Sequence, residues 1–439
     1  MNINRTMLDS FMLQGFWTVD GEHEVQGLLK CTQGKATLTL LESILIDTDD
    51  IFSQSSDNIP RVWGFAQTGE QILLINCAYT VKSTYMPGCS EYICRAESML
   101  ISNGYFEASK SHCDLRTVLQ RIEIRKIEFQ LAWLHVWIGR TATFGSSHPN
   151  GTESISYNLD EYSTDTYSFG EYFIITTGKR IHQHHGSDLI AKNISVSETD
   201  VIHIEKREGS LALPEALIII RRISTLIELL VDESMPIVSI SFALPIEQFE
   251  DNEQGLIGAR YFMSQINTNS AEPNASCIKL NKLKGKFQDV LNAWNTHYDK
   301  LLLIVNDYLG AKRMERYLET SLLLSIRSLE ILGRNFDLTS TKTDLDSIEI
   351  KKKNGQSELR PNLKALLRIL PPVYIKRYLE PLVISSLDSD CVIDEFVDKL
   401  VDTRNFYAHN DINKPYAKRF KTVRELHEVT ISLMSSIIN

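Results

Sequence analysis

The spacing of apolar residues changes once along this chain, and that change constrains its fold more than any other feature. From about residue 24 to 245, apolar and polar residues mostly alternate, which is typical of strands with one buried and one exposed face. The clearest example is the segment 236–244, whose alternating apolar residues are Val238, Ile240, Phe242 and Leu244. Behind residue 284, apolar residues recur about every 3.6 positions, as on one side of a helix. The sequence therefore predicts a β-rich front and a helical back.

This pattern predicts an α+β multidomain protein. The front half is expected to form antiparallel strands in a sandwich or barrel, and the back half an all-α helical bundle. We predict a β-rich region over 1–265, with one or two domains, a polar linker over 266–283 and a helical domain over 284–439. The segment 121–139 is ambiguous and could be a seam within the front region. The second long helix is expected to stop at Gly333, because glycine favours helix ends.

The composition is that of a globular protein and excludes several classes. Hydrophobic residues make up 43% and charged residues 23% of the 439 positions, so neither a disordered nor a fibrous chain is indicated. No apolar run approaches the roughly 18 residues of a membrane span, so we expect a cytoplasmic protein without a membrane partner. The motifs of P-loop, dinucleotide-binding, α/β-hydrolase and classical zinc-protease enzymes are absent from the sequence. The net charge of -10 argues against wholesale coating by nucleic acid but permits a local basic site.

One arginine falls on the apolar side of the predicted helix at 392–408. At about 100° per residue, Arg404 lies about 20° from Ile393, near the centre of the apolar stripe. An unpaired guanidinium costs several kcal/mol to bury, so an acidic partner, an interface or a phosphate is expected at this position. A residue that breaks the local pattern in this way often marks a functional site.

Two further polar residues follow Arg404. Asn405 and His409 are four residues apart and share a helical face, so the amide could orient the imidazole. Arg404 and His409 are five apart and point about 140° away from each other on a straight helix. To meet, either the helix must end near Ala408, or two copies of the helix must approach across a two-fold axis.

The segment 404–409, RNFYAH, matches the RNxxxH signature of HEPN ribonucleases, and its place late in a helical bundle is similar to theirs. A β-rich front followed by this helical end also resembles the ApeA-like anti-phage HEPN proteins. The specific motif covers only the C-terminal part, whereas the front half is similar by architecture. An Arg and a His at this spacing occur by chance in about every second chain of this length, and the Asn lowers this to roughly a few per cent.

The resemblance implies an endoribonuclease that needs no metal or other cofactor. In such an enzyme the 2′-hydroxyl of RNA attacks the neighbouring phosphate, which leaves a 2′,3′-cyclic phosphate and a 5′-hydroxyl. His409 would act as general acid or base, Arg404 would stabilise the phosphate charge, and Asn405 would hold the geometry. The implied setting is abortive infection, in which a toxin released by a phage-derived trigger cuts tRNA near the anticodon. The angle between Arg404 and His409 makes a homodimer or higher homo-oligomer part of the expected mechanism.

A structural reading of the same residues remains open. Arg404 could pair with Glu330 or Glu395, while His409 only caps the end of the helix. Glu330 stands where the ApeA-like pattern has an acidic residue, so it is either a supporting acid for Arg404 or His409 or a surface carboxylate.

A basic segment follows the motif at 414–424. It interleaves cations with Tyr416 and Phe420, which suits an RNA strand because cations bind phosphates and exposed aromatics stack on bases. A solvated helix start with Phe420 in the core explains it equally well. The predicted RNA-binding residues are Lys414, Lys418, Arg419, Lys421 and Arg424.

Other candidate groups carry weaker signals. His182, His184 and His185 lie close together, and the first two would share a strand face, as metal ligands or as part of a solvent-facing loop. His203 is expected on the exposed face of a strand. The seven cysteines, with Cys89 and Cys94 the closest pair, indicate inert thiols. The alternative function is a non-catalytic interaction protein whose bundle dimerises or docks RNA or another ligand.

Overall fold

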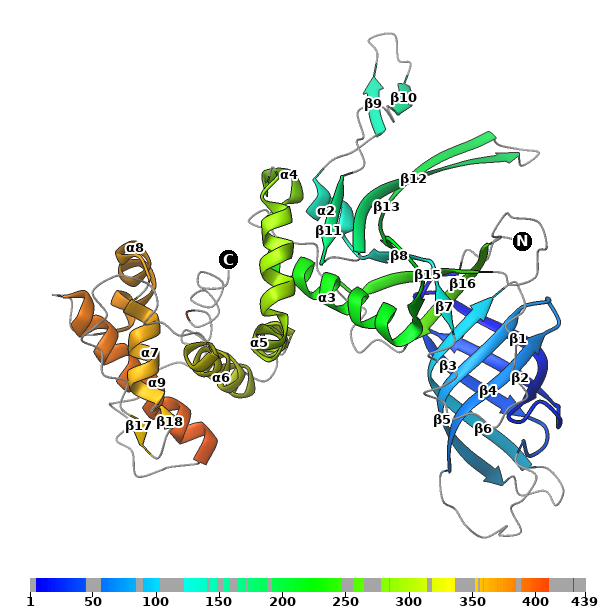
Figure 1. The fold of residues 1–439 in the computed structure, drawn as a ribbon, viewed down its shortest axis with the longest axis horizontal. Helices are drawn as coiled ribbons and strands as arrows, with labels where there is room; N and C mark the ends of the chain where they lie inside the picture. The colour runs from blue at the N-terminus through cyan, green and yellow to red at the C-terminus, as the bar shows by residue number, and fades with distance from the viewer. Residues whose placement is uncertain are drawn as a thin grey trace. The chain divides into compact units, whose positions relative to one another are not determined.

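The chain forms two compact units (Figure 1). The β-rich unit comprises Met1–Ile227 and Met235–Asn292, and the helical unit comprises Glu228–Ser234 and Ala293–Asn439. The predicted order, a β-rich front and a helical back, is confirmed. The computed structural model describes residues 5–44, 57–83, 90–102, 122–139, 143–147, 153–157, 165–170, 173–187, 192–245, 256–263, 278–283, 285–313, 318–335, 352–353, 356–357, 359–368, 370–383, 388–409 and 429.

Six antiparallel strands at the start of the β-rich unit close into a barrel. They are β1 (Ser10–Thr18), β2 (Val25–Thr32), β3 (Lys35–Leu40), β4 (Asp57–Ala66), β5 (Gln71–Ser83) and β6 (Ser90–Ser102). Neighbours around the barrel are β1, β2, β3, β6, β5 and β4, and β4 pairs with β1 to complete the circle. On β1, Leu13 and Trp17 are buried inside while Met12 and Phe16 point outward. Alternation along the strand therefore fills the barrel, as the sequence predicts.

Strand β6 belongs to the barrel and to a second sheet at once. The second sheet consists of β8 (Lys126–Leu131), β11 (Thr166–Phe169), β12 (Phe173–Ser187), β13 (Lys192–Lys206), β15 (Ile237–Pro245) and β16 (Leu256–Met263). One edge of β6 pairs with β5, whereas its other edge pairs with β3 at residues 92–96 and with β16 at residues 98–102. From β16 the sheet continues through β15, β8, β13 and β12 to β11. Backbone hydrogen bonds thus join the barrel and the sheet along one strand.

Short elements and three helices complete the β-rich unit. They are β7 (Glu123–Ile124), α2 (Leu134–Ile138), β9 (Thr143–Ser147), β10 (Glu153–Tyr157), β14 (Leu211–Ala212), α3 (Leu213–Val231) and α4 (Leu280–Leu283). The ambiguous segment 121–139 thus contains β7, β8 and α2. Of the predicted linker, residues 278–283 are described; they contain α4, in which Leu280 is buried.

Helix α3 interrupts a region that the sequence pattern indicated as strands. The Glu215 carboxylate accepts a hydrogen bond from the backbone N–H of Ala212 at 3.3 Å, which caps the first turn. At the other end Asp232 adopts φ 61°, and the N–H of Glu233 bonds the carbonyl of Glu228. This is the Schellman arrangement, with an aspartate in the place usually taken by glycine. The buried Tyr308 hydroxyl donates a hydrogen bond to the Asp232 carboxylate.

The helical unit is built from antiparallel and crossing helices with one short hairpin. Its elements are α5 (Phe287–Arg313), which begins in the β-rich unit, α6 (Leu318–Asn335), β17 (Lys352–Lys353), β18 (Gln356–Ser357), α7 (Leu359–Arg368), α8 (Pro372–Tyr374), the π-helix η2 (Ile375–Leu379), the 3-10 helix η3 (Glu380–Leu382) and α9 (Ser389–His409). Helices α5 and α6 are joined by the Ser328 hydroxyl, which donates to the Ile304 carbonyl at 3.2 Å, and by the Arg327–Asp307 ion pair. None of the described helices is both long and apolar enough to cross a membrane.

Two local predictions were wrong. Helix α6 continues through Gly333 to Asn335, so this glycine does not end it. In β15, Ile240, Phe242 and Leu244 are buried as predicted, but Val238 is only partly buried while Ser239 is buried. The cause is a register shift between Ile237 and Ser239 where β15 pairs with β8, because one extra residue reverses the alternation of the faces.

Gly34 fixes the β2–β3 turn against the end of β16. It has φ +76°, and a Cβ at this position would lie 2.1 Å from the carbonyl oxygen of Met263. Gly209 has nearly the same φ, +79°, but a Cβ added there would meet no other atom within 4 Å. The two glycines therefore share one conformational requirement and differ in packing.

Replacing each glycine by alanine separates these two effects. Gly209→Ala should destabilise the protein by about 1 kcal/mol through the left-handed backbone alone. Gly34→Ala should cost roughly 1–3 kcal/mol more, because the turn must move away from β16. Thermal unfolding of the two full-length variants measures the difference. Equal melting temperatures would contradict the packing of this turn on β16.

Candidate functional site

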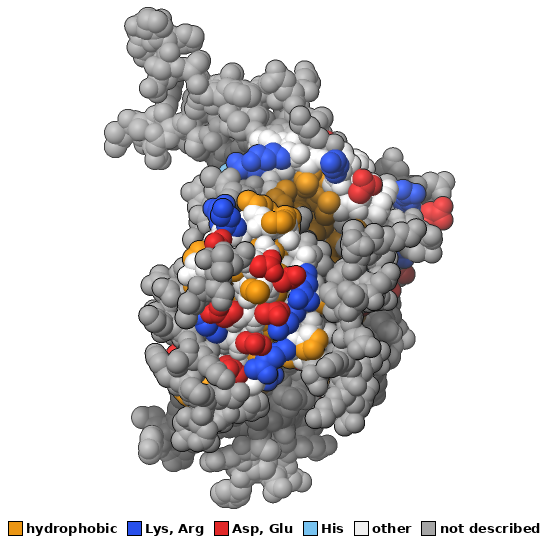
Figure 2. Space-filling view, turned by 90° about the vertical axis from the view of Figure 1, so that its left-hand side faces the viewer, with side chains coloured by type: hydrophobic (Ala, Val, Ile, Leu, Met, Phe, Trp, Pro, Cys, Tyr) orange, Lys and Arg blue, Asp and Glu red, His pale blue; other side chains and the backbone are white. Residues whose placement is uncertain are grey.

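A ladder of opposite charges joins the antiparallel helices α7 and α9. Three cations on α7 face a row of aspartates on α9, and both rows repeat every four residues, which keeps each on one helical face. Figure 2 shows Lys and Arg side chains beside Asp and Glu side chains over this part of the surface. The ion pairs are Arg360 with Asp398 and Asp402, Lys364 with Asp394, and Arg368 with Asp390 and Asp394.

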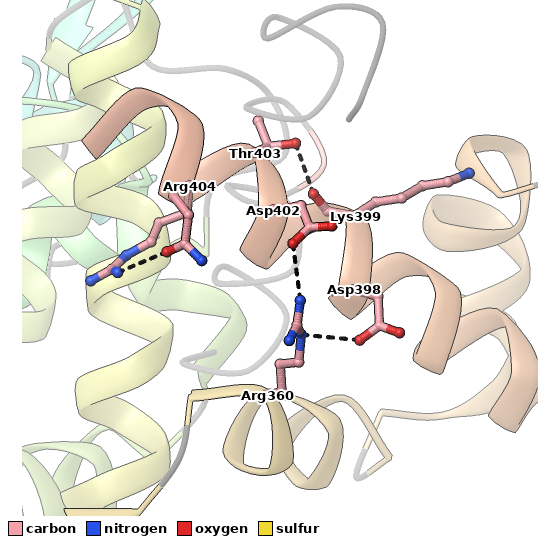
Figure 3. Close-up of polar contacts among 7 residues, drawn as sticks. Arg360, Asp398, Lys399, Asp402, Thr403 and Arg404 are labelled. Atoms are coloured by element: carbon pink, nitrogen blue, oxygen red, sulfur yellow. Dashed lines mark hydrogen bonds and ion pairs between the residues drawn. The ribbon is translucent and has the colours of Figure 1, made fainter. Parts of the chain in front are cut away.

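The pair at one end of this ladder is more enclosed than the others. Arg360 Nη2 donates to Asp402 Oδ1 at 3.0 Å, and Arg360 Nε lies 3.2 Å from Asp398 Oδ1 (Figure 3). The Asp402 side chain is only 6% exposed, whereas that of Asp398 is 57% exposed. Burial of an unpaired carboxylate is costly, so Arg360 constrains how α9 lies against α7. The neighbouring Thr403 hydroxyl donates to the Lys399 carbonyl at 2.8 Å.

Arg404 lies on the opposite side of α9 from the Arg360–Asp402 pair, and its guanidinium points away from that pair (Figure 3). It is partly exposed, in contrast to the buried stripe residues Phe396, Val397 and Leu400. Because Arg360, near the start of α7, already pairs with Asp402, residues after Asp402 extend past that helix.

The Arg404 guanidinium has one partner among the described residues. Its Nη1 donates to the Asn405 side-chain oxygen at 3.2 Å, so the Arg–Asn pair is preformed within α9. In the part of the chain that the structure describes, no ion pair joins Arg404 to Glu330 or Glu395, and Glu395 instead lies 2.6 Å from Lys399 Nζ. Glu330 is partly exposed near the end of α6 and interacts with a residue other than Arg404. The arginine thus keeps donors available for an anion.

Helix α9 includes His409 as its last residue, so the backbone does not break at Ala408. The His409 side chain lies outside the described parts of the chain. On a helix that continues to this residue, the directions of Arg404 and His409 still differ by about 140°. Because α9 ends at His409, one residue after Ala408, both expected arrangements, a turn of the chain at the helix end and the approach of two copies of α9, remain predictions.

Several other predicted residues are placed only in part. The RNA-binding candidates Lys414, Lys418, Arg419, Lys421 and Arg424 lie outside the described residues. His182, His184 and His185 lie on β12, where His182 and His184 share a face by register, and their side chains are not described.

The remaining histidine and cysteine predictions can be compared with the structure. His203 is on β13 with 37% of its side chain exposed, as predicted, and its Nδ1 lies 3.6 Å from Glu128 Oε2. Burial raises the pKa of the Cys31 thiol to about 11, which suppresses the reactive thiolate. Cys94 is also buried, and Cys89 lies outside the described residues. Of the four described thiols, the buried Cys31, Cys77 and Cys94 match the expectation of inert cysteines, whereas Cys391 is exposed.

Sequence reasoning missed the cations of α7. The signal was present as two rows with a spacing of four, one of Arg and Lys at 360, 364 and 368 and one of Asp at 390, 394, 398 and 402. Complementary rows of this kind indicate which two helices pair. Antiparallel order follows because the first cation meets the last aspartates.

Fold and site together define a chain in which a closed β-barrel and an attached sheet precede a helical unit that carries an Arg–Asn pair. The family model described as ApeA N-terminal domain 1 matches residues 12–294, well over half of the chain, and the chain belongs to this family. Membership suggests a protein of anti-phage defence. Neither a curated protein nor a solved structure matches the chain.

The different burial of the ladder pairs leads to a stability prediction. Arg360→Ala leaves the buried Asp402 carboxylate without its cation and should destabilise the protein by about 1–3 kcal/mol. Arg368→Ala on the same helix removes the partner of Asp390, which is 64% exposed, and should cost about 0–1 kcal/mol. Urea unfolding of both variants gives the comparison, and a larger loss for Arg368→Ala would refute the proposed importance of Asp402.

Proposed function

We propose that this protein is a metal-independent HEPN endoribonuclease that acts in anti-phage defence by cutting RNA, with tRNA near the anticodon as its target. The observation that carries the proposal is the RNxxxH segment on α9, in which Arg404 and Asn405 are already paired. Membership of the ApeA family supports the defence role. The proposed ribonuclease domain spans residues 284–439.

The chemistry assigns one task to each residue. The 2′-hydroxyl of the RNA attacks the adjacent phosphorus, and the bond to the 5′-oxygen breaks. His409 acts as general base that takes the proton from the 2′-hydroxyl, or as general acid that gives a proton to the leaving 5′-oxygen. An imidazole is suited to either task at neutral pH. Arg404 donates hydrogen bonds to the phosphate oxygens as negative charge builds up on them. Asn405 holds the guanidinium through its side-chain oxygen, at 3.2 Å.

The active species is a homodimer in which two α9 helices meet. The approach brings Arg404 of one subunit toward His409 of the other, which a single straight helix does not allow. Glu330 serves as a supporting acid, and the cations between Lys414 and Arg424 bind the RNA backbone. The β-rich unit restrains the nuclease until a phage-derived trigger releases it.

Incubation of the protein with total tRNA in EDTA, together with a lysate of phage-infected cells that supplies the trigger, tests the activity. The wild type should produce fragments with 2′,3′-cyclic phosphate ends, and DNA should remain intact. Arg404→Ala should lower the cleavage rate by about 100-fold or more, and His409→Ala by about 100- to 10,000-fold.

Arg377→Ala is the matched control, because Arg377 is an exposed arginine of the same unit, positioned over the Tyr378 ring on η2. It should cleave like the wild type. Cleavage that survives in both motif variants would rule out the assignment. Absence of cleavage in the wild type, with the trigger-containing lysate of infected cells added, would support the non-catalytic alternative.

A further inference from the structure

The outer face of the barrel carries large apolar side chains that are open to solvent. Five of them are at least two-fifths exposed, although large apolar residues are normally inside. A contiguous patch of this kind marks an interaction surface more often than isolated exposed residues do. The five are Met12 (65% exposed), Phe16 (49%), Leu28 (43%), Leu41 (68%) and Phe65 (51%).

Strand register shows that these side chains form one patch. Phe16 on β1 lies directly opposite Phe65 on β4 and opposite Gln26 on β2. Leu41 continues this row, because its N–H bonds the Gln26 carbonyl at 3.2 Å. Leu28 is two residues from Gln26 on the same face, and Met12 lies opposite the next outward residue, Lys30. Neighbours at these positions are about 5 to 8 Å apart, within side-chain reach.

The patch carries a negative charge near one end of β2 and a positive charge near the other end. Outward positions along this strand run from Glu24 through Gln26 and Leu28 to Lys30, and all four are exposed. At about 3.3 Å per residue, the two charges are about 20 Å apart. Neither charge forms an ion pair with any residue in the described ranges. The surface therefore carries apolar side chains between two ends whose charges are complementary to each other.

The closed barrel limits how a partner can bind. Its six strands use both edges for pairing within the chain, so a seventh strand cannot be added to the β1–β2 side. Only packing against the face remains. Large apolar side chains interspersed with the uncharged polar residues Gln14, Gln26, Thr37 and Thr39 are a composition found in protein–protein interfaces.

We propose that this face of the barrel binds the same face of a second copy of the chain. With a two-fold axis across β2 in the plane of contact, Lys30 of each copy meets Glu24 of the other. The same operation places Phe16 over Gln14 of the second copy and beside its Leu28, twice. The contact is isologous and therefore closes as a pair. It uses residues of the β-rich unit alone and does not depend on the nuclease assignment.

Exchange of the two charges tests the proposal in the full-length protein. Lys30→Glu and Glu24→Lys should each weaken self-association at least tenfold in sedimentation velocity, because like charges then oppose each other twice. An equimolar mixture of the two variants should restore it, since every pair across the mixed contact is again of opposite sign. Circular dichroism verifies that both variants are folded.

Phe16→Lys should also weaken self-association, and Ile218→Lys is its control, because Ile218 is 52% exposed on α3, outside the patch. The proposal would be overturned if the charge variants associated like the wild type, or if their mixture failed to recover self-association. It would also be overturned if Phe16→Lys removed none of the self-association of the wild type. Loss of RNA cleavage in Arg404→Ala with unchanged self-association would separate this interface from the nuclease site.

Discussion

The contact between Arg360 and Asp402 determines where the candidate site can lie. It is the most enclosed pair of the α7–α9 ladder, with the aspartate side chain 6% exposed, and it occurs at the first turn of α7. A buried carboxylate needs its cation, so this end of α9 is held while the last turn continues past α7. Arg404 and Asn405 lie just beyond the Arg360–Asp402 pair on α9, and their hydrogen bond presents a guanidinium that is only partly buried.

A second constraint organises the β-rich unit. Strand β6 is shared by the barrel and the six-stranded sheet, so one set of backbone hydrogen bonds supports both. Because the barrel is closed, its β1–β2 side has no free strand edge. The apolar patch there and the motif on α9 are thus two separate features, each positioned by the pairing of regular elements.

The two periods in the sequence predicted the class of fold because burial follows the repeat of strands and helices. They could not predict barrel closure, which depends on pairing between distant strands. The bulge at Val238 and the helix α3 were missed for local reasons, namely an extra residue in a strand and a single helix among strands. Helical angles gave the apolar stripe of α9 but not the exposure of Arg404, which depends on how the surrounding helices pack.

Complementation between two inactive variants tests most directly whether the α9 motif forms a nuclease site across two subunits. Arg404→Ala and His409→Ala are mixed under conditions that exchange subunits, and cleavage of tRNA is measured without metal. Half of the dimers then contain one chain of each variant. In such a dimer one of the two sites has both an intact Arg404 and an intact His409, which come from different chains. About a quarter of wild-type activity should therefore return. A mixture as inactive as either variant alone would contradict this account.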